Sequence, residues 1–202
     1  MAYTVPTHNP AAGVIIPSSY GDNVRDSLTA LNTMFCVPLF PRSSGQVPLS
    51  GLTAAAYSVV QSSGAGTVKP QYPVLAFASD ADEGRMWCFT MPRGYGATLT
   101  VNGAYYTTAV AGTVVFVAQL AVISDGDTGV TAKVYDAANA LSAQTVPGVA
   151  ATEETFSITM TNADSGAAND RCYFTLLRDI SEDTAAADIL LTRLDLFFNL
   201  EA

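Results

Sequence analysis

The sequence has few of the side chains that catalysis or metal binding requires. Its single histidine, His8, lies in a proline-containing N-terminal stretch, and its three cysteines, Cys36, Cys88 and Cys172, are far apart. Serine or cysteine hydrolases need a histidine beside the nucleophile, and zinc sites need clustered His or Cys ligands. No glycine-rich phosphate loop precedes a helical pattern. We therefore expect no catalytic residues, no cofactor and no metal ligands.

Targeting and cross-linking signals are also missing. No apolar run approaches the ~20 residues of a membrane span. The first residues lack the basic and apolar regions of a secretory signal, so we expect the protein to stay in the cytoplasm where it is made. An odd number of cysteines without a secretion signal argues against a disulfide framework. Cys88 and Cys172 lie in strand patterns, where we expect buried free thiols.

Charge is scarce and mainly negative. Charged residues make up 13% of the chain, and the net charge is −9. Nucleic-acid binding needs basic patches that neutralise phosphates, whereas the nine basic residues here are scattered singly. Direct binding of DNA or RNA is therefore not expected. Because 49% of the residues are hydrophobic, much apolar surface must be hidden in a core or against other chains.

Two acidic turns are the remaining candidates for site chemistry. Asp80, Asp82 and Glu83 form one, and Asp125 and Asp127 form the other. Such clusters bind calcium or act as paired carboxylates in some proteins. Neither has the spacing of an EF-hand loop, and acidic turns between strands are common. We interpret both as solvated turns.

Residues 1–18 are expected to form an extended arm. They contain three prolines, no charged residue, and the apolar cluster Val14, Ile15 and Ile16. Proline removes a backbone donor and fixes φ, which disfavours a helix. Disordered arms usually carry charge, so an uncharged apolar arm is expected to lie on a surface. That surface is either a binding partner or the chain's own domain.

Residues 19–34 carry the one convincing helical pattern. Val24, Leu28 and Leu31 form a narrow apolar stripe, and Tyr20 lies near its start. A helix of about four turns is marginal alone and needs a partner, either the rest of the domain or the same helix of a sister chain. With the arm, these side chains are our candidate contacts to a larger scaffold.

The composition changes near residue 73. Eight of the ten prolines precede residue 74, and Ser/Gly-rich runs are frequent between residues 35 and 72. This composition predicts an irregular segment at 35–72, with one short strand at Tyr57–Gln61, followed by a regular domain at 73–202.

The regular domain is expected to be an antiparallel β-sandwich of jelly-roll or immunoglobulin-like type. Short strands separated by turns, with no helical pattern among them, are typical of that fold. Trp87, Phe89 and Met91 are expected in the core, as are Phe156 and Ile158 beneath an outer row of threonines. The candidate strands are Val74–Ala78, Arg85–Met91, Ala97–Thr107, Thr113–Ile123, Val130–Asp136, Thr155–Thr161, Cys172–Arg178 and Ala187–Phe198.

We expect the stretch from Arg171 to Phe198 to organise the rest of the domain. It reads as two long strands around an acidic, turn-rich connection. In the last strand, Phe197 and Phe198 point to opposite sides, so we expect that strand in the middle of a sheet. Leu190 and Leu194 are assigned to one face of it.

Segment Thr113–Ile123 is apolar on both faces, which predicts cover on both faces. In a two-sheet sandwich the outer cover must come from the arm, the 35–72 segment or another subunit. We expect a homotrimer in which each subunit covers its neighbour's apolar patch. The candidate interface residues are Val115, Val117, Ala121, Ile123 and Phe197.

Several motifs together resemble a β-sandwich domain common among virion proteins of tailed bacteriophages. They are RMWCFTMP with Trp87 and Pro92, the strand that begins at Gly112, and FSITMTN with the segment that follows. In the last of these a strand ends in Arg178-Asp179, and an acidic turn contains Asp183-Thr184. The segment DNVRDSLTALN resembles a helix near the start of phage tail and capsid-associated proteins. Phe116 stands where the pattern favours tryptophan, which keeps an aromatic residue there.

The resemblance implies a structural protein of the virion, assembled in the host cytoplasm. One interpretation is a capsid decoration (cement) protein whose arm and helix bind the major capsid protein. The other is a tail or fibre component whose sandwich binds a host glycan. A glycan site would need exposed aromatic residues beside polar groups, and Tyr95, Tyr105 and Tyr106 are the candidates. The decoration protein is our first expectation and the glycan-binding module our second.

Overall fold

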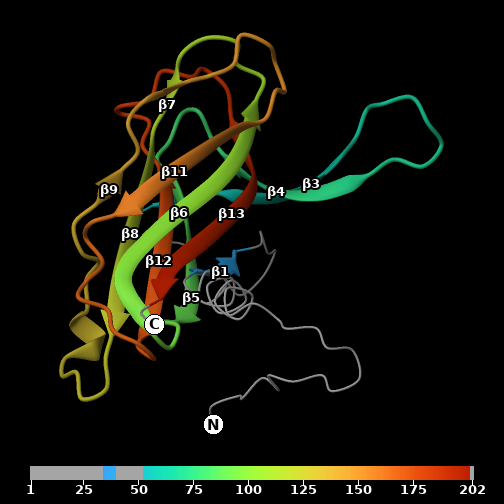
Figure 1. Cartoon of the computed structure of the whole chain (residues 1–202). Coiled ribbons are helices and arrows are strands. Elements are labelled where there is room, and N and C mark those ends of the chain that lie inside the picture. The colour runs from blue at the N-terminus through green and yellow to red at the C-terminus, as the bar shows by residue number, and fades with distance from the viewer. Residues whose placement is uncertain (1–33, 40–51, 201–202) are drawn as a thin grey trace, which may run out of the picture.

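A computed structural model describes residues 34–39 and 52–200 of the chain. These residues form a β-sandwich of two antiparallel-rich sheets, as predicted (Figure 1). We call the six-stranded sheet "sheet A" and the five-stranded sheet "sheet B". In spatial order, sheet A contains β11 (Glu154–Met160), β6 (Tyr95–Thr107), β13 (Ile189–Leu200), β4 (Gln71–Phe77) and β3 (Ala56–Gln61), with β1 (Met34–Pro38) also paired to β13. Sheet B contains β2 (Thr53–Ala54), β5 (Glu83–Thr90), β12 (Arg171–Arg178), β8 (Phe116–Ile123) and β9 (Asn139–Ala140). A small separate sheet pairs β7 (Thr113–Val114) with β10 (Gln144–Thr145).

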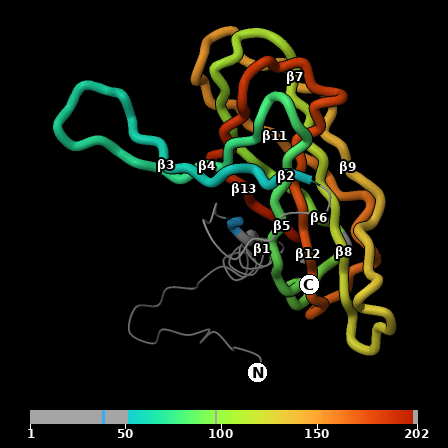
Figure 2. Tube along the Cα trace, turned by 180° about the vertical axis from the view of Figure 1, so that it is seen from behind, coloured from blue at the N-terminus to red at the C-terminus, as the bar shows by residue number. Residues whose placement is uncertain are grey.

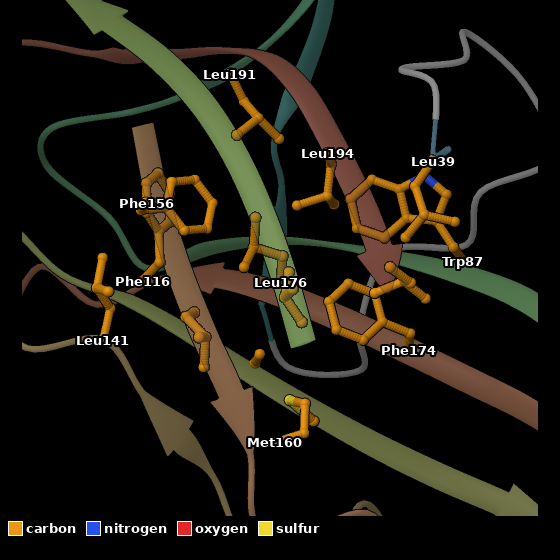
Figure 3. Packing of buried hydrophobic residues seen from close by; sticks show 14 of the residues in the cluster. Leu39, Trp87, Phe116, Leu141, Phe156, Met160, Phe174, Leu176, Leu191 and Leu194 are labelled. Atoms are coloured by element: carbon orange, nitrogen blue, oxygen red, sulfur yellow. The ribbon is translucent and has the colours of Figure 1, made fainter. Parts of the chain in front are cut away.

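The core lies between the two sheets and follows the period-two alternation of the strands. In β11, Phe156, Ile158 and Met160 are buried while the residues between them are exposed. In β5, Trp87 is buried and contacts the ring of Phe174 from β12 at a centroid distance of 5.9 Å. Figure 3 shows these side chains filling the space between the sheets. The predicted inward residues of both strands are confirmed.

The two C-terminal strands occupy central positions, one in each sheet. β12 lies between β5 and β8 in sheet B, and β13 lies between β6 and β4 in sheet A. The prediction that the last strand sits in the middle of a sheet is confirmed. Its assigned faces are partly wrong, because Leu191 is buried together with Leu194. A register shift between Leu191 and Arg193 inserts one extra residue and changes the phase of the strand.

The doubly apolar segment is covered on its outer face by the chain itself. Val117 and Ala121 point away from the core, yet they are only 8% and 6% exposed. The chain after β8 folds back along β8. The Asp136 backbone N–H donates to the Leu120 carbonyl at 2.9 Å, and the Gln119 side-chain amide donates to the Asp136 backbone carbonyl at 3.2 Å. Burial of the returning segment, together with a neighbouring tyrosine, also raises the pKa of the Tyr135 hydroxyl. The expectation that the cover must come from the arm, the 35–72 segment or another subunit is therefore wrong for these residues.

The expected strand at Val130–Asp136 is not formed. Residues Val130–Ala132 form a short 3-10 helix preceded by Gly129, whose φ of +73° lies in the left-handed region. The remaining residues belong to the returning segment beside β8. The alternation of apolar residues was too short there to outweigh the turn imposed by the glycine.

The 35–72 segment contributes strands to both sheets, so its assignment as irregular is wrong where it is described. β3 matches the predicted short strand Tyr57–Gln61 closely, and β4 begins two residues before the predicted domain start at 73. β2 and β1 were not predicted. Met34, assigned to the end of the helix, is the first residue of β1. The rest of the predicted arm and helix lies outside the described residues.

A buried ion pair closes one end of the sandwich. Arg178, at the end of β12, has no exposed surface, and its Nε donates to Asp183 Oδ2 at 2.8 Å while Nη2 donates to Oδ1 at 3.1 Å. The guanidinium also donates to four backbone carbonyls, those of Phe77, Ala78, Ala185 and Ala187. One side chain thus ties the end of β12 to the end of β4 and to the acidic connection before β13.

Thr184, Thr113 and Gly112 complete the same corner. Thr184 Oγ1 accepts a hydrogen bond from the Thr113 N–H at 2.9 Å, and the Thr113 carbonyl accepts from Thr184 and Ala185. Gly112 has φ +104°, and a Cβ atom there would lie 2.6 Å from the Thr184 carbonyl oxygen. These contacts make the segment a structural corner of the sandwich.

Cys88 and Cys172 differ in environment. Cys172 is fully buried as expected, and burial raises the pKa of its thiol to about 12. Cys88 is exposed on the outer face of sheet B, so its predicted burial is wrong. The register pairs Cys88 with Tyr173, so the two cysteines point to opposite faces of the sheet and remain free. Within the described part of the chain, no helix is long and apolar enough to span a bilayer.

Candidate functional site

The outer face of sheet A carries polar side chains on three neighbouring strands. The strand register places Ser157 of β11, Asn102 of β6 and Asp195 of β13 side by side in one row. The next row contains Thr100 and Phe197. Adjacent strands are about 4.8 Å apart, so each row spans roughly 10 Å across the sheet. The result is a polar surface with one aromatic ring at its side.

The alternation that builds the core also builds this surface. On β11, the core residue Phe156 is flanked by Thr155 and Ser157, which are exposed. On β13, Leu194 and Leu196 are buried, and the residues between and beyond them face outward. Successive strand residues point to opposite sides, so a ladder with an apolar inner face leaves its outer face free for polar residues. The site therefore lies on three paired strands whose inner faces form part of the core.

Two connected hollows mark the surface, and we call them together the sheet A groove. The larger has a volume of about 550 Å³, and a neighbouring hollow of about 310 Å³ shares Asn102 and Phe197 with it. The larger hollow is lined by Asn102, Gln144, Thr155, Phe156, Ser157, Arg193, Asp195 and Phe197. The smaller is lined by Thr98, Thr100, Asn102, Phe197, Phe198 and Asn199. Concave sites of this size with a few convergent polar groups are typical of ligand binding.

The charged groups of the groove compensate one another. Arg193 Nε lies 3.3 Å from Asp195 Oδ2. The Arg193 side chain is 58% exposed and the Asp195 side chain is 17% exposed, so the carboxylate is held in the floor while the guanidinium reaches solvent. The remaining lining groups are amides and hydroxyls. The groove therefore has little net charge although the whole chain carries −9.

The groove offers hydrogen bonds from side chains only. The backbone N–H and C=O groups of β6 and β13 are used by the ladders with their neighbouring strands. Among the described strands β11 pairs only with β6, so its remaining main-chain groups point away from the groove at the sheet edge. An extended peptide binds a sheet mainly through unpaired main-chain groups at its edge. A ligand in this groove must instead present many hydroxyl or amide groups to Asn102, Asp195 and Arg193, and an apolar face to Phe197.

The tyrosines proposed for a glycan site do not line the groove. Tyr105 is fully buried and packs on Phe116, and burial raises the pKa of its hydroxyl to about 12. The ring of Tyr95 contacts Phe198 at 6.0 Å between ring centroids. Tyr106 is half-buried beside Tyr72, and burial with that hydrogen-bonding neighbour raises its pKa to about 12. The aromatic ring of the groove belongs to Phe197, which we had assigned to a subunit interface.

The predicted interface residues are not gathered on one exposed patch. Val115, Val117 and Ala121 are buried within the single chain, and Ile123 is half-buried at the end of β8 in sheet B. Phe197 lies in the other sheet, in the groove. The exposed apolar face that motivated the trimer is therefore absent at the first three positions, and trimer formation stays a prediction.

The candidate scaffold-binding residues lie outside the described part of the chain, so attachment to a capsid or tail protein also stays a prediction. These residues are Val14, Ile15, Ile16, Tyr20, Val24, Leu28 and Leu31.

The acidic turns act locally in the fold. Asp82 accepts a hydrogen bond from the Ile180 N–H, and Glu83 accepts one from the Ala78 N–H. Asp127 accepts from the Ser124 N–H within its own turn. Across residues 34–39 and 52–200, no group of three or more His, Cys, Asp or Glu side chains is arranged to hold a metal ion.

The groove residues could have been found from the sequence only in part. The outward row of β11 was recognised as polar, but Asn102, Arg193 and Asp195 were not singled out. Each strand pattern shows which residues face outward, and it does not show which strands are neighbours. A search for polar outward residues on three predicted strands would have found the residue types and would have left their adjacency open.

Comparisons with known proteins give distant structural similarities only. No protein-family model and no curated protein matches the sequence. Among solved structures, a family 16 carbohydrate-binding module is similar with 18% identity and a TM-score of 0.40, over 70% of this chain and 85% of that one. The CBM22-1 xylan-binding domain from Paenibacillus barcinonensis is similar with 13% identity and a TM-score of 0.45, over 83% and 95% of the two chains. The enzymatically active domain of bacteriophage CBA120 tailspike protein 4 is similar with 8% identity and a TM-score of 0.38, over 82% of this chain and 19% of that one. Likeness of this degree concerns the sandwich and does not extend to what those proteins bind.

Proposed function

We propose that this protein is a non-catalytic binding module that holds a neutral carbohydrate in the sheet A groove. The observation that carries the proposal is the row Ser157–Asn102–Asp195 beside Phe197, three adjacent polar side chains next to one aromatic ring. A sugar ring has hydroxyl groups around its rim and apolar C–H groups on its faces. That combination matches a groove with polar groups along its floor and a ring at its side.

The polar groups have the required donor and acceptor types. The Asp195 carboxylate accepts two or more hydrogen bonds, the Asn102 amide both donates and accepts, and the Arg193 guanidinium donates. Neighbouring sugar hydroxyls are donors and acceptors at once, so they can satisfy adjacent carboxylate and amide groups together. Hydrogen bonds to a charged partner contribute about 1.5–3 kcal/mol, and those between neutral groups about 0.5–1.5 kcal/mol.

Other ligand classes fit the groove less well. A nucleic acid would need unpaired basic groups against its phosphates, and Arg193 is already paired with Asp195. A peptide lying across this face would find the main-chain groups of β6 and β13 already paired. A largely apolar ligand would cover Asn102 and the hydroxyls of Thr155 and Ser157 without offering them hydrogen bonds, which costs binding free energy.

The test is a titration of the protein with a panel of neutral gluco-, xylo-, manno- and galacto-oligosaccharides, followed by calorimetry. We expect at least one of them to bind. Asp195→Ala should raise the Kd for that ligand roughly ten- to a hundredfold, because hydrogen bonds to a charged group are lost. Asn102→Ala should raise it roughly two- to tenfold, because only neutral hydrogen bonds are lost. The Arg193 side chain is 58% exposed, so loss of its ion pair with Asp195 should cost the fold at most about 1 kcal/mol.

Thr90→Ala is the matched control, because Thr90 is an exposed residue on the outer face of sheet B. It should leave affinity unchanged. Failure of every neutral oligosaccharide to bind would contradict the proposal, as would equal affinity of the Asp195→Ala variant and the wild type.

A further inference from the structure

The hairpin of β3 and β4 projects away from the sandwich, as Figures 1 and 2 show from opposite sides. β4 pairs with β13 only through Leu75, Ala76 and Phe77. Beyond that point the hairpin has two strands, from the pair Ser58–Val74 to its tip. An isolated two-stranded hairpin is marginally stable in water, so this one gains from further pairing.

The ladder shows which backbone groups at the β3 edge are free for pairing. The Ser62 N–H donates to the Pro70 carbonyl at 3.0 Å, which identifies 62 and 70 as a hydrogen-bonded pair. Hydrogen-bonded and non-hydrogen-bonded pairs alternate in antiparallel ladders. The backbone groups of Tyr57, Val59 and Gln61 therefore point away from β4, and no described strand lies on that side.

The two edges of the hairpin differ in protection. The same alternation points the backbone of Pro73 outward on the β4 edge, where proline has no N–H to leave unpaired. The β3 edge has no proline, no bulge and no charged residue, which are the usual devices against edge pairing. Val59 is 52% exposed on it. The open edge of the hairpin is thus β3.

We propose that β3 pairs with β3 of a second copy of this chain to form an antiparallel, two-fold symmetric dimer. The three residues whose backbone groups point away from β4, Tyr57, Val59 and Gln61, are spaced symmetrically about Val59. With Val59 opposite Val59 of the second copy, Tyr57 lies opposite Gln61. The outward N–H and C=O groups of all three residues then find partners. No like charges face each other across this pairing. The pairing is a form of strand addition in which the partner is the same strand.

Charge favours the second copy as the occupant. Lys69, near the hairpin tip, is the only charged residue between 52 and 77, while the chain as a whole carries −9. Continuing the register places residue 63 opposite Ala55 of the second copy. Ala55 donates to the Gly84 carbonyl, next to the acidic turn of Asp80 and Asp82. The basic tip of each hairpin therefore points toward the acidic turn of the other molecule.

The test is sedimentation velocity of the full chain over a concentration series up to about 100 µM. The wild type should form a species of about 42 kDa, twice the 21.1 kDa chain mass. Val59→Pro removes the N–H at the centre of the dimer ladder without touching a hydrogen bond within the hairpin. Loss of two hydrogen bonds across the two-fold axis should raise the dimer Kd roughly tenfold or more.

Val59→Lys, which adds like charges at the axis, should have the same effect. Val110→Lys is the matched control, since Val110 is 56% exposed and lies in the connection after β6. It should leave the Kd within about twofold. Hydrogen exchange adds an independent measure: the amides of Tyr57, Val59 and Gln61 should become protected as the wild-type concentration rises.

Three results would overturn the inference: a wild-type chain that stays monomeric throughout, a trimer mass, or a dimer whose Kd and edge protection are unchanged by both substitutions at Val59. If Val59→Pro fails to fold by circular dichroism, Val59→Lys and the wild-type exchange data decide. The inference does not rest on carbohydrate binding, because the groove and the β3 edge involve different residues.

Discussion

Replacement of Arg178 by methionine should be among the most destabilising single changes in this protein. The substitution keeps a long apolar stem and removes the guanidinium that bonds Asp183 and four backbone carbonyls. The Asp183 side chain is only 2% exposed, so its carboxylate would stay buried without its counter-ion. Breaking a buried ion pair in this way costs about 3–5 kcal/mol.

The whole free energy of unfolding of a domain is about 5–15 kcal/mol, so this loss is a large fraction of it. For a chain of this length, each 1 kcal/mol lowers Tm by about 2–4 °C, and we expect a Tm lower by roughly 10 °C. The assay is urea unfolding followed by fluorescence of Trp87, the one tryptophan of the sequence and a buried residue. The free energy of unfolding is obtained from the midpoint and slope.

The double variant Arg178→Met/Asp183→Leu separates the ion pair from the carbonyl bonds. It no longer buries a lone carboxylate, so it should be less destabilised than the sum of the two single variants by about 2 kcal/mol or more. A loss below about 1 kcal/mol for Arg178→Met would refute the assignment of this pair as the closure of the sandwich, because that is the level of an exposed ion pair.

Two further predictions concern thiol reactivity and acid sensitivity. At neutral pH an alkylating reagent should modify Cys88 in the folded protein and leave Cys172 unmodified until urea unfolds the chain, because burial raises the pKa of the Cys172 thiol to about 12. Peptide mass spectrometry measures the labelling of each cysteine. Equal labelling rates of Cys88 and Cys172 would contradict the prediction. Hydrogen bonds from the Asp164 and Ala137 N–H groups lower the pKa of Asp136 below its ordinary value of 3.8, so the stability that this carboxylate contributes is full above that value and is lost as the pH falls toward the folded pKa. The difference in free energy of unfolding between the wild type and Asp136→Asn, measured by urea titration, should therefore become smaller as the pH falls below 3.8. A difference that grows in acid would contradict the lowered pKa of Asp136.

The sequence predicted the sandwich because its core strands alternate strictly. Phe156, Ile158 and Met160 show the pattern in β11, and Trp87 shows it in β5, with Met91 buried directly after that strand. In β13 a bulge at Thr192 changes which residues face the core. Strict alternation assigns Leu190 and Leu194 to one face, whereas the structure buries Leu191 together with Leu194. Local alternation cannot reveal an inserted residue, since the shift depends on the partner strand.

The site was harder to predict than the fold. Asn102 and Asp195 are 93 positions apart in the sequence, and only the β6–β13 register brings them together. The cover over Ala121 was missed for the same reason, because it depends on a return of the chain after a turn at Gly129. The projecting hairpin lies in a segment whose Pro, Ser and Gly content favoured an irregular assignment, although Tyr57–Gln61 was recognised as a strand.

The most direct test of carbohydrate binding in the sheet A groove is a backbone-amide NMR titration of the isotope-labelled chain with the best oligosaccharide of the neutral panel. We predict that the largest shift changes fall on Asn102, Ser157, Asp195 and Phe197. Amides on the outer face of sheet B, such as those of Thr90 and Gln119, should not move. Shift changes confined to sheet B or to the β3–β4 hairpin, or no change with any oligosaccharide, would contradict the proposed site.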